Sequence, residues 1–229
     1  MARNIRIVAL GFGALVLAVG GARAASYPAM APLAQYLSAT PADEIALARS
    51  AAPPSVSNDA EVLVLGAHGY ENAAPGKNGF VCIVERAWAN EFGNAEFWNP
   101  KMRAPICFNA ASARSVLPTY LKRTQWVLAG VPQDEMLART KAMIASGEIP
   151  APEAGAMCFM QSKSGYLNDA GGHWHPHLMF YVPRIAPAQW GANAPGSPVI
   201  GDDGSIEPLT VFFVTVGKWS DGSSAMEMH

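Results

Sequence analysis

Three of the chain's five histidines occupy alternate positions in one short stretch: His173, His175 and His177. In a β-strand, residues two apart point to the same face at a separation of about 6.6–6.8 Å, so two neighbouring imidazoles can converge on one ion. Zinc binds imidazole nitrogens at ~2.0–2.1 Å. The stretch therefore predicts a divalent-metal site, with zinc as the expected ion.

The number of histidines that bind the ion depends on the shape of the strand. His173 and His177 would lie about 13 Å apart in a straight strand, which is too far for one ion. Pro176 indicates an edge strand or a bulge, and a bulge would bring all three together. Otherwise one adjacent pair binds the metal and the third histidine acts as an acid, a base or an outer-shell group. A solvent-exposed polar face and metal-free acid–base chemistry remain alternatives.

The same stretch predicts a strand over residues 174–182 with two different faces. Met179 and Tyr181 continue the face of the histidines, so that face is expected to be partly covered. The opposite face is expected to point into the core through Trp174, Leu178, Phe180 and Val182.

A second candidate site lies near His68, in a glycine-flanked loop that follows a predicted strand. A zinc site needs ligands beyond one His-x-His pair, and His68, Glu71 and Asp169 are the nearest residues of suitable type. In a metal-dependent hydrolase the ion would activate water, and His68 or Glu71 would be the catalytic general base. An ordinary loop histidine is the alternative for His68.

Helix-capping residues predict the helices around these sites. Thr40 precedes a helix over residues 41–51. Asn109 begins a helix that Pro118 interrupts and restarts and that ends at Gly130, and a further helix follows Pro132 and ends at Gly147. These last helices are expected to form a helical pair.

Short β-branched and aliphatic runs predict the strands, over residues 62–65, 80–84, 156–160, 174–182 and 210–216. The first two are expected to pair as a hairpin across the loop 66–79. The aromatic segment 86–104 shows no clean period and is predicted to be irregular. The fold class is therefore α+β, a mostly antiparallel sheet packed with a helical pair.

The N-terminus has the pattern of a secretory signal peptide over residues 1–24. Arg3 and Arg6 precede an apolar run, and Ala22 and Ala24 suit a cleavage site. The expected arrangement is a signal peptide, an extended segment with one helix over residues 25–60, and a single compact α+β domain over residues 61–229. An exported protein of this kind would be periplasmic or secreted.

Three cysteines remain in what would be an oxidising compartment: Cys82, Cys107 and Cys158. None belongs to a Cys-x-x-Cys motif, which argues against a thioredoxin-like or zinc-ribbon role. Three buried thiols and one disulfide are both open. If a disulfide forms, Cys82 and Cys107 are the preferred pair, because they are closest in sequence and both lie beside predicted extended segments.

Composition limits the function classes. The chain has 229 residues and a formal net charge of −2, which argues against a nucleic-acid partner. No second apolar run is long enough to span a membrane, and the ligand, a small molecule or a peptide, is not specified. The expected function is an exported protein with a divalent-metal site, either a metal-dependent hydrolase or a non-catalytic metal-binding protein. The alternative is an interaction protein that uses the aromatic segment 86–104.

Overall fold

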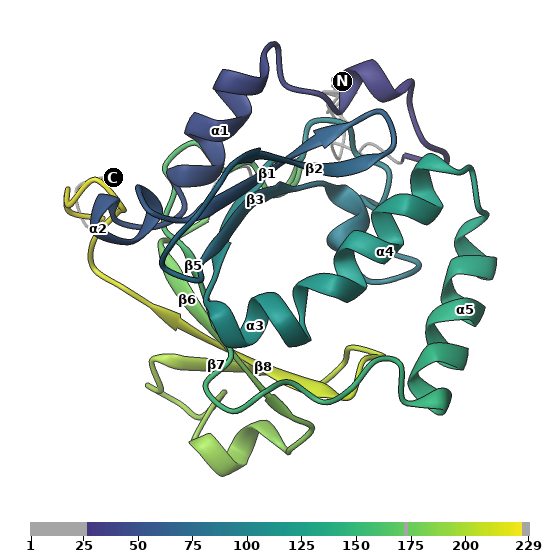
Figure 1. Cartoon of the computed structure of the whole chain (residues 1–229). Coiled ribbons are helices and arrows are strands. Elements are labelled where there is room, and N and C mark those ends of the chain that lie inside the picture. The colour runs from purple at the N-terminus through teal and green to yellow at the C-terminus, as the bar shows by residue number, and fades with distance from the viewer. Residues whose placement is uncertain (1–26, 172–173, 226–229) are drawn as a thin grey trace, which may run out of the picture.

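The framework of the molecule is an 8-stranded sheet in the order β2-β1-β3-β4-β5-β6-β8-β7 (Figure 1). The structure is a computed structural model and describes residues 27–171 and 174–225. The strands are β1 (Glu61–Gly66), β2 (Gly69–Ala74), β3 (Val81–Glu85), β4 (Ala104–Phe108), β5 (Met157–Met160), β6 (His177–Pro183), β7 (Val199–Asp202) and β8 (Leu209–Thr215).

Helices and short 3-10 turns surround this sheet. Together the elements form one α+β domain, as the sequence predicts. The α-helices are α1 (Pro41–Arg49), α2 (Pro54–Ser57), α3 (Ala110–Ser115), α4 (Leu117–Leu128) and α5 (Gln133–Ser146), and the 3-10 turns are η1 (Leu33–Gln35), η2 (Ala87–Ala89) and η3 (Pro187–Trp190).

The predicted helix starts and the predicted end of α5 agree with the structure, whereas α1 ends at Arg49 rather than at residue 51, the break between α3 and α4 falls at Val116 rather than at Pro118, and α2 was not predicted. Asp43 N donates to Thr40 Oγ1 over 3.1 Å at the start of α1, and Ser112 N donates to Asn109 Oδ1 over 3.0 Å at the start of α3. α5 ends at Gly147, whose φ of 78° lies in the left-handed region that glycine adopts without strain.

All neighbouring strands pair antiparallel except β1 and β3, which are parallel. The prediction of a hairpin between these two strands is therefore wrong. After β1 the chain turns at Ala67 and His68 and forms β2, which pairs with β1 on the side opposite to β3. β3 then runs antiparallel to β2, which makes it parallel to β1.

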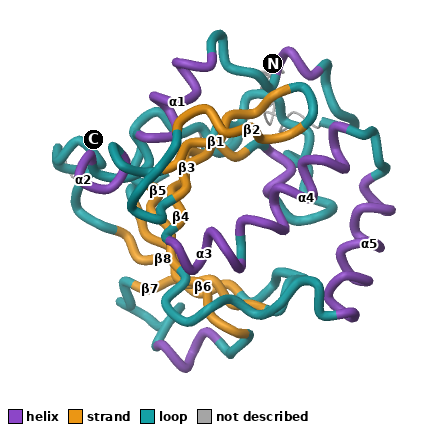
Figure 2. The backbone as a smooth tube through the Cα atoms, viewed as in Figure 1, coloured by secondary structure: helices purple, strands orange, loops and turns teal. Residues whose placement is uncertain are grey.

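The sheet curves around α3 and α4, and α1 lies on its outer side (Figure 2). Alternate residues of each strand therefore enter different cores. Ile83 and Ile106 belong to the core of the inner, concave face, whereas Val84 packs with Ala48 of α1 on the outer face. The inner core is the larger of the two and contains Trp88, Phe97, Phe108 and Tyr181.

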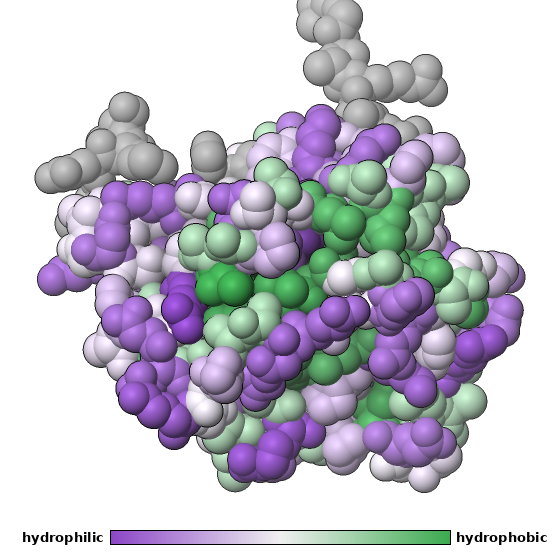
Figure 3. Space-filling model, turned by 45° about the horizontal axis from the view of Figure 1, so that its top comes forward, coloured by the Kyte–Doolittle hydropathy of each residue, from purple (hydrophilic) through white to green (hydrophobic). Residues whose placement is uncertain are grey.

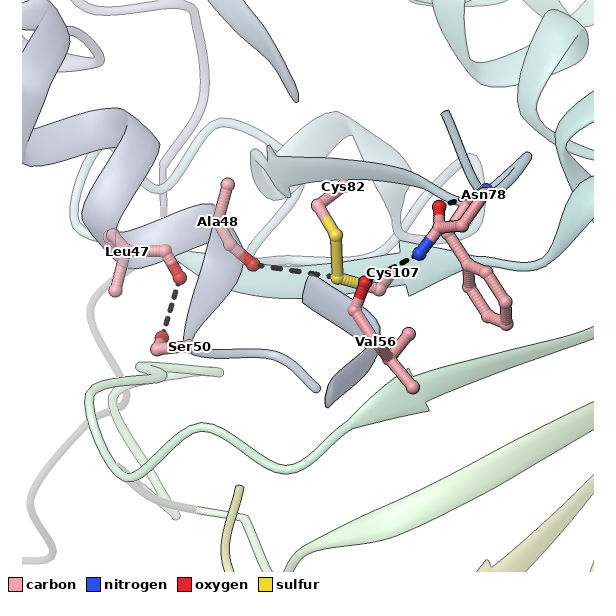
Figure 4. The surroundings of a disulfide bond; sticks show 8 residues. Leu47, Ala48, Ser50, Val56, Asn78, Cys82 and Cys107 are labelled. Carbon is pink, nitrogen blue, oxygen red and sulfur yellow. Dashed lines mark hydrogen bonds between the residues drawn. A yellow bond between two sulfur atoms is a disulfide. The ribbon is translucent and has the colours of Figure 1, made fainter. Parts of the chain in front are cut away.

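The disulfide between Cys82 and Cys107 lies on the outer face, where it links β3 to β4 (Figure 4). The two residues are directly opposite one another in the antiparallel ladder. Ala48 of α1 packs over the bond, and its carbonyl oxygen lies 3.7 Å from Cys107 Sγ. The preferred pairing is therefore confirmed, and Cys158 is a buried free thiol on the inner face.

The predicted signal peptide lies outside the described residues. No helix within residues 27–171 and 174–225 has both the length and the apolar character needed to cross a membrane. The disulfide is consistent with folding in an oxidising compartment.

Candidate functional site

His68 and Glu71, the predicted catalytic pair, lie at the β2 edge of the sheet. His68 is exposed in the turn between β1 and β2, and Glu71 is exposed on β2. The histidine stretch leads into β6, and β1, β3, β4 and β5 lie between β2 and β6 in the sheet. The fold therefore places this pair and the histidine stretch in different regions of the sheet.

Of the three predicted metal ligands, His173 lies outside the described residues. His175 is exposed and precedes β6, and His177 is the first residue of that strand and is half-buried. His177 Nδ1 lies 2.7 Å from the carbonyl oxygen of His175. Burial lowers the pKa of His177 below its usual 6.5. A neutral imidazole that donates from Nδ1 leaves its Nε2 lone pair available.

Among residues 27–171 and 174–225, no group of three or more His, Cys, Asp or Glu side chains is arranged to hold a metal ion. Asp169, the remaining candidate by type, already accepts hydrogen bonds from other side chains. Tyr166 Oη donates to it, as do Tyr27 Oη over 2.6 Å and Lys101 Nζ over 3.0 Å. These interactions hold its pKa well below the usual range and join the N-terminal segment to the segment before β6.

The prediction of which strand face enters the core is wrong for β6. Met179 and Tyr181 are buried in the inner core, whereas Leu178 and Phe180 are only partly buried on the other face. Both faces of this strand carry apolar residues, so alternation alone does not distinguish them. The inner face is the more deeply buried one because the curved sheet wraps around α3 and α4 (Figure 2).

Trp174 is buried as predicted, but it lies before the strand and packs on the inner side. Its Nε1 donates to the Ser162 carbonyl over 3.1 Å. A Cβ atom at Gly165 would lie 2.3 Å from the indole Cζ2, so the absence of a side chain at Gly165 makes room for Trp174. The indole meets the His177 ring edge-on at a centroid distance of 6.1 Å.

The inner face of the sheet and α4 enclose a cavity of about 560 Å³. Exposed residues at its border, including Glu91, Asn94 and Asp202, show that it opens to solvent there. Figure 3 shows one face of the molecule on which apolar side chains gather in the middle and polar ones surround them. The apolar lining of the cavity includes Ala104, Phe108, Met160, Leu167, Trp174, Met179, Leu209, Val211 and Phe213.

Glu85, the last residue of β3, brings a carboxyl group into this lining. It has no hydrogen-bond or ion-pair partner among the described residues. Burial raises its pKa from 4.5 to about 7, and the charge of Arg123 opposes this shift only in part. A carboxyl group without a partner in an apolar cavity is unusual in a folded protein, because its charged form loses hydration without compensation.

Several other polar groups of the cavity already have partners in the protein. Arg123 forms an ion pair with Glu207 over 2.8 Å, donates to the Trp88 carbonyl over 3.1 Å and stacks on the Phe92 ring at 4.4 Å. Tyr120 Oη accepts a hydrogen bond from Arg86 N over 2.7 Å. Tyr181 Oη lies 3.3 Å from Cys158 Sγ. Glu85 is therefore the acidic group in the interior of this cavity whose oxygens are available to a ligand, beside the unpartnered Nε of Arg123 and Nε2 of His177.

Sequence reasoning did not select Glu85. The available signal was an acidic residue that directly follows the apolar run 80–84. Such a residue is normally interpreted as the solvated end of a strand, and its partial burial becomes visible only when β4, α4 and β6 are placed around it.

The chain matches no known family model, and no curated protein or solved structure is significantly similar to it. The interpretation of the site therefore rests on its own geometry.

Replacing Glu85 with Gln should stabilise the protein at neutral and alkaline pH. An acid with a pKa of about 7 in the folded state and 4.5 when unfolded holds its proton longer in the folded state, so stability falls as pH rises between these values. The gap corresponds to at most ~3 kcal/mol, and because solvent reaches the cavity we expect a gain of about 1–3 kcal/mol at about pH 8. Near about pH 4 the variant and the original protein should be equally stable. Urea unfolding at both pH values measures this difference, and an equal gain at both would contradict it.

Proposed function

We propose that this chain is an exported protein, periplasmic or secreted, that binds a small, largely apolar molecule in the cavity between the sheet and α4. The enclosed volume of about 560 Å³ carries the proposal. Ligand sites typically have ~300–1,000 Å³, an apolar lining and a few convergent polar groups. The disulfide on the opposite face of the sheet supports export.

A neutral fluorescent probe, N-phenyl-1-naphthylamine, tests this function. It should bind the protein with a blue-shifted, enhanced emission, because the cavity transfers its rings out of water. Replacing Val211 with Trp fills part of the cavity from β8 and should weaken binding at least about tenfold, ~1.4 kcal/mol. Val214 lies three positions further along β8, on the opposite face of the sheet and outside the cavity lining, so Val214→Trp makes the same change away from the cavity and should leave the affinity unchanged. Equal affinity in the two variants, or no binding to the original protein, would refute the proposal.

A second candidate function is metal binding by His173, His175 and His177, with zinc as the expected ion. The contact between His177 Nδ1 and the His175 carbonyl favours it, because metal-binding imidazoles usually donate their other nitrogen to such a group. The depressed pKa of His177 keeps its ring neutral, as ligation requires. This site can serve metal storage or transfer without a reaction. A hydrolase would need its general base close to these histidines rather than at His68 or Glu71 on the β2 edge.

Zinc titration by calorimetry tests the metal site. Replacing His175, which belongs to either adjacent pair, with Ala should abolish binding, and binding to the original protein should weaken below about pH 6.5 as the imidazoles become protonated. His68→Ala, an exposed histidine in the β1–β2 turn, is the matched control and should change nothing. Equal zinc affinity of the His175→Ala variant and the original protein would exclude the site.

A further inference from the structure

We infer that the ligand of the cavity carries a positive charge and that Glu85 is its counter-ion. This inference rests on the proposed binding function and specifies the ligand class: an organic cation, such as a protonated amine attached to an apolar body. Three features of the cavity support it: the free carboxyl group, the charge of the lining and the aromatic surfaces.

The first feature is the hydrogen bonding of the polar side chains in the cavity. The Arg123 Nη atoms, the Tyr120 hydroxyl and the Tyr181 hydroxyl each have partners in the protein, whereas the Glu85 carboxyl group has none among the described residues. A buried charge without a partner is strongly unfavourable, and an ion pair with hydrogen bonds offsets this penalty. A bound ammonium group supplies both the charge and the donors that the Glu85 oxygens lack.

The second feature is the total charge of the residues that line the cavity. Four lining residues are acidic, Glu85, Glu91, Asp202 and Glu207, and the lining contains one arginine, Arg123. Glu91 and Asp202 are exposed at the opening, and Glu207 pairs with Arg123. The potential of the cavity is therefore negative, which attracts cations and repels anions such as fatty acids.

The third feature is the aromatic surface of the cavity that Glu85 shares. Tyr120, Tyr181, Trp174 and Phe108 line the same cavity as Glu85. Aromatic faces attract cations, with a contribution of about 0.5–2 kcal/mol for each well-placed ring. An apolar cation therefore gains from the walls of the cavity as well as from its carboxyl group, whereas a neutral apolar molecule leaves Glu85 unpaired.

Two probes with the same fluorophore and chain, one cationic and one neutral, test this inference. Dansylcadaverine carries a primary ammonium group, and its N-acetyl derivative is neutral with the same fluorophore and chain. The protein should bind the cationic probe at least about tenfold more tightly, as expected for an ion pair that is shielded from solvent. Glu85→Gln should remove this preference and still bind the neutral probe, which also shows that the variant is folded.

Glu91→Gln is the matched control, because it removes the same charge from an exposed position at the opening. It should retain most of the preference for the cation. Equal affinity of the original protein for the two probes, or an unchanged preference in Glu85→Gln, would overturn the inference and leave the binding function intact. Failure of the original protein to bind either probe would refute the binding function itself.

Discussion

Replacing Arg86 with Met should lower the free energy of unfolding by about 3–5 kcal/mol, because it leaves the Glu44 carboxylate charged and unpaired in the protein interior. The Arg86 side chain is 0% exposed and that of Glu44 is 2% exposed. Arg86 Nη2 donates to both carboxylate oxygens of Glu44, over 2.9 and 2.7 Å, and Nε donates to the Tyr36 carbonyl over 2.7 Å. One guanidinium thus joins β3, α1 and the segment that precedes α1.

The Glu44 carboxylate also accepts hydrogen bonds from two other residues. Leu65 N of β1 donates to Oε1 over 3.2 Å, and Ser38 Oγ donates to Oε2 over 2.6 Å. The double variant Glu44→Leu, Arg86→Met should therefore lose less stability than the single Arg86→Met, because no buried charge remains in it.

An exposed ion pair provides the control for this experiment. Arg114 and Glu153 approach to 2.6 Å, but their side chains are 62% and 43% exposed. Arg114→Met should cost less than about 1 kcal/mol. Urea unfolding of the three variants measures the differences, and a loss for Arg86→Met no larger than that for Arg114→Met would show that the buried pair contributes little.

The helix ends of this protein could be predicted from the sequence because they depend on local interactions. Thr40 and Asn109 accept hydrogen bonds from residues three positions along the chain, so their effect is visible in a short window of sequence. Gly147 ends α5 through its own backbone conformation. The disulfide pairing could be preferred because the two cysteines are close in sequence and Cys82 lies in a predicted strand, whereas β4, which contains Cys107, was not predicted.

The edge strands could not be predicted in the same way. β2 has the sequence Gly-Tyr-Glu-Asn-Ala-Ala, and most of its side chains are exposed, so it lacks an apolar pattern. β7 carries Ile200 in an exposed position and lies within the predicted loop 191–205. The parallel pairing of β1 with β3 follows from the insertion of β2 between them along the chain. Because β2 was not predicted, the parallel pairing could not be predicted either.

The candidate sites show a related difference. The histidine stretch is visible in the sequence because its residue type is rare and its spacing is regular. The importance of Glu85 comes from what surrounds it: a largely apolar cavity built from β4, β5, β6, β8 and α4, in which Tyr120 and Tyr181 already have partners. That property belongs to the tertiary structure, and no spacing along the chain encodes it.

Removing the disulfide should have the second largest effect on stability. The bond joins residues separated by 25 positions, and closing a loop of this length stabilises the folded state by about 3 kcal/mol in the chain-entropy model. The variant Cys82→Ala, Cys107→Ala should therefore lose about this amount in urea unfolding. Dithiothreitol should lower the stability of the original protein to a similar extent and have no effect on the double variant.

Cys158 provides the control that separates the effect of breaking the disulfide from the effect of removing a buried sulfur atom. It is a free thiol enclosed by the inner core, and burial raises its pKa, so it resists alkylation in the folded protein. Under denaturing, non-reducing conditions the alkylating agent should modify Cys158 alone, and mass spectrometry counts the modified cysteines. Modification of all three would show that Cys82 and Cys107 are not bonded. Cys158→Ala should remain sensitive to dithiothreitol, because the bond that dithiothreitol reduces lies on the opposite face of the sheet, beneath Ala48 of α1 (Figure 4).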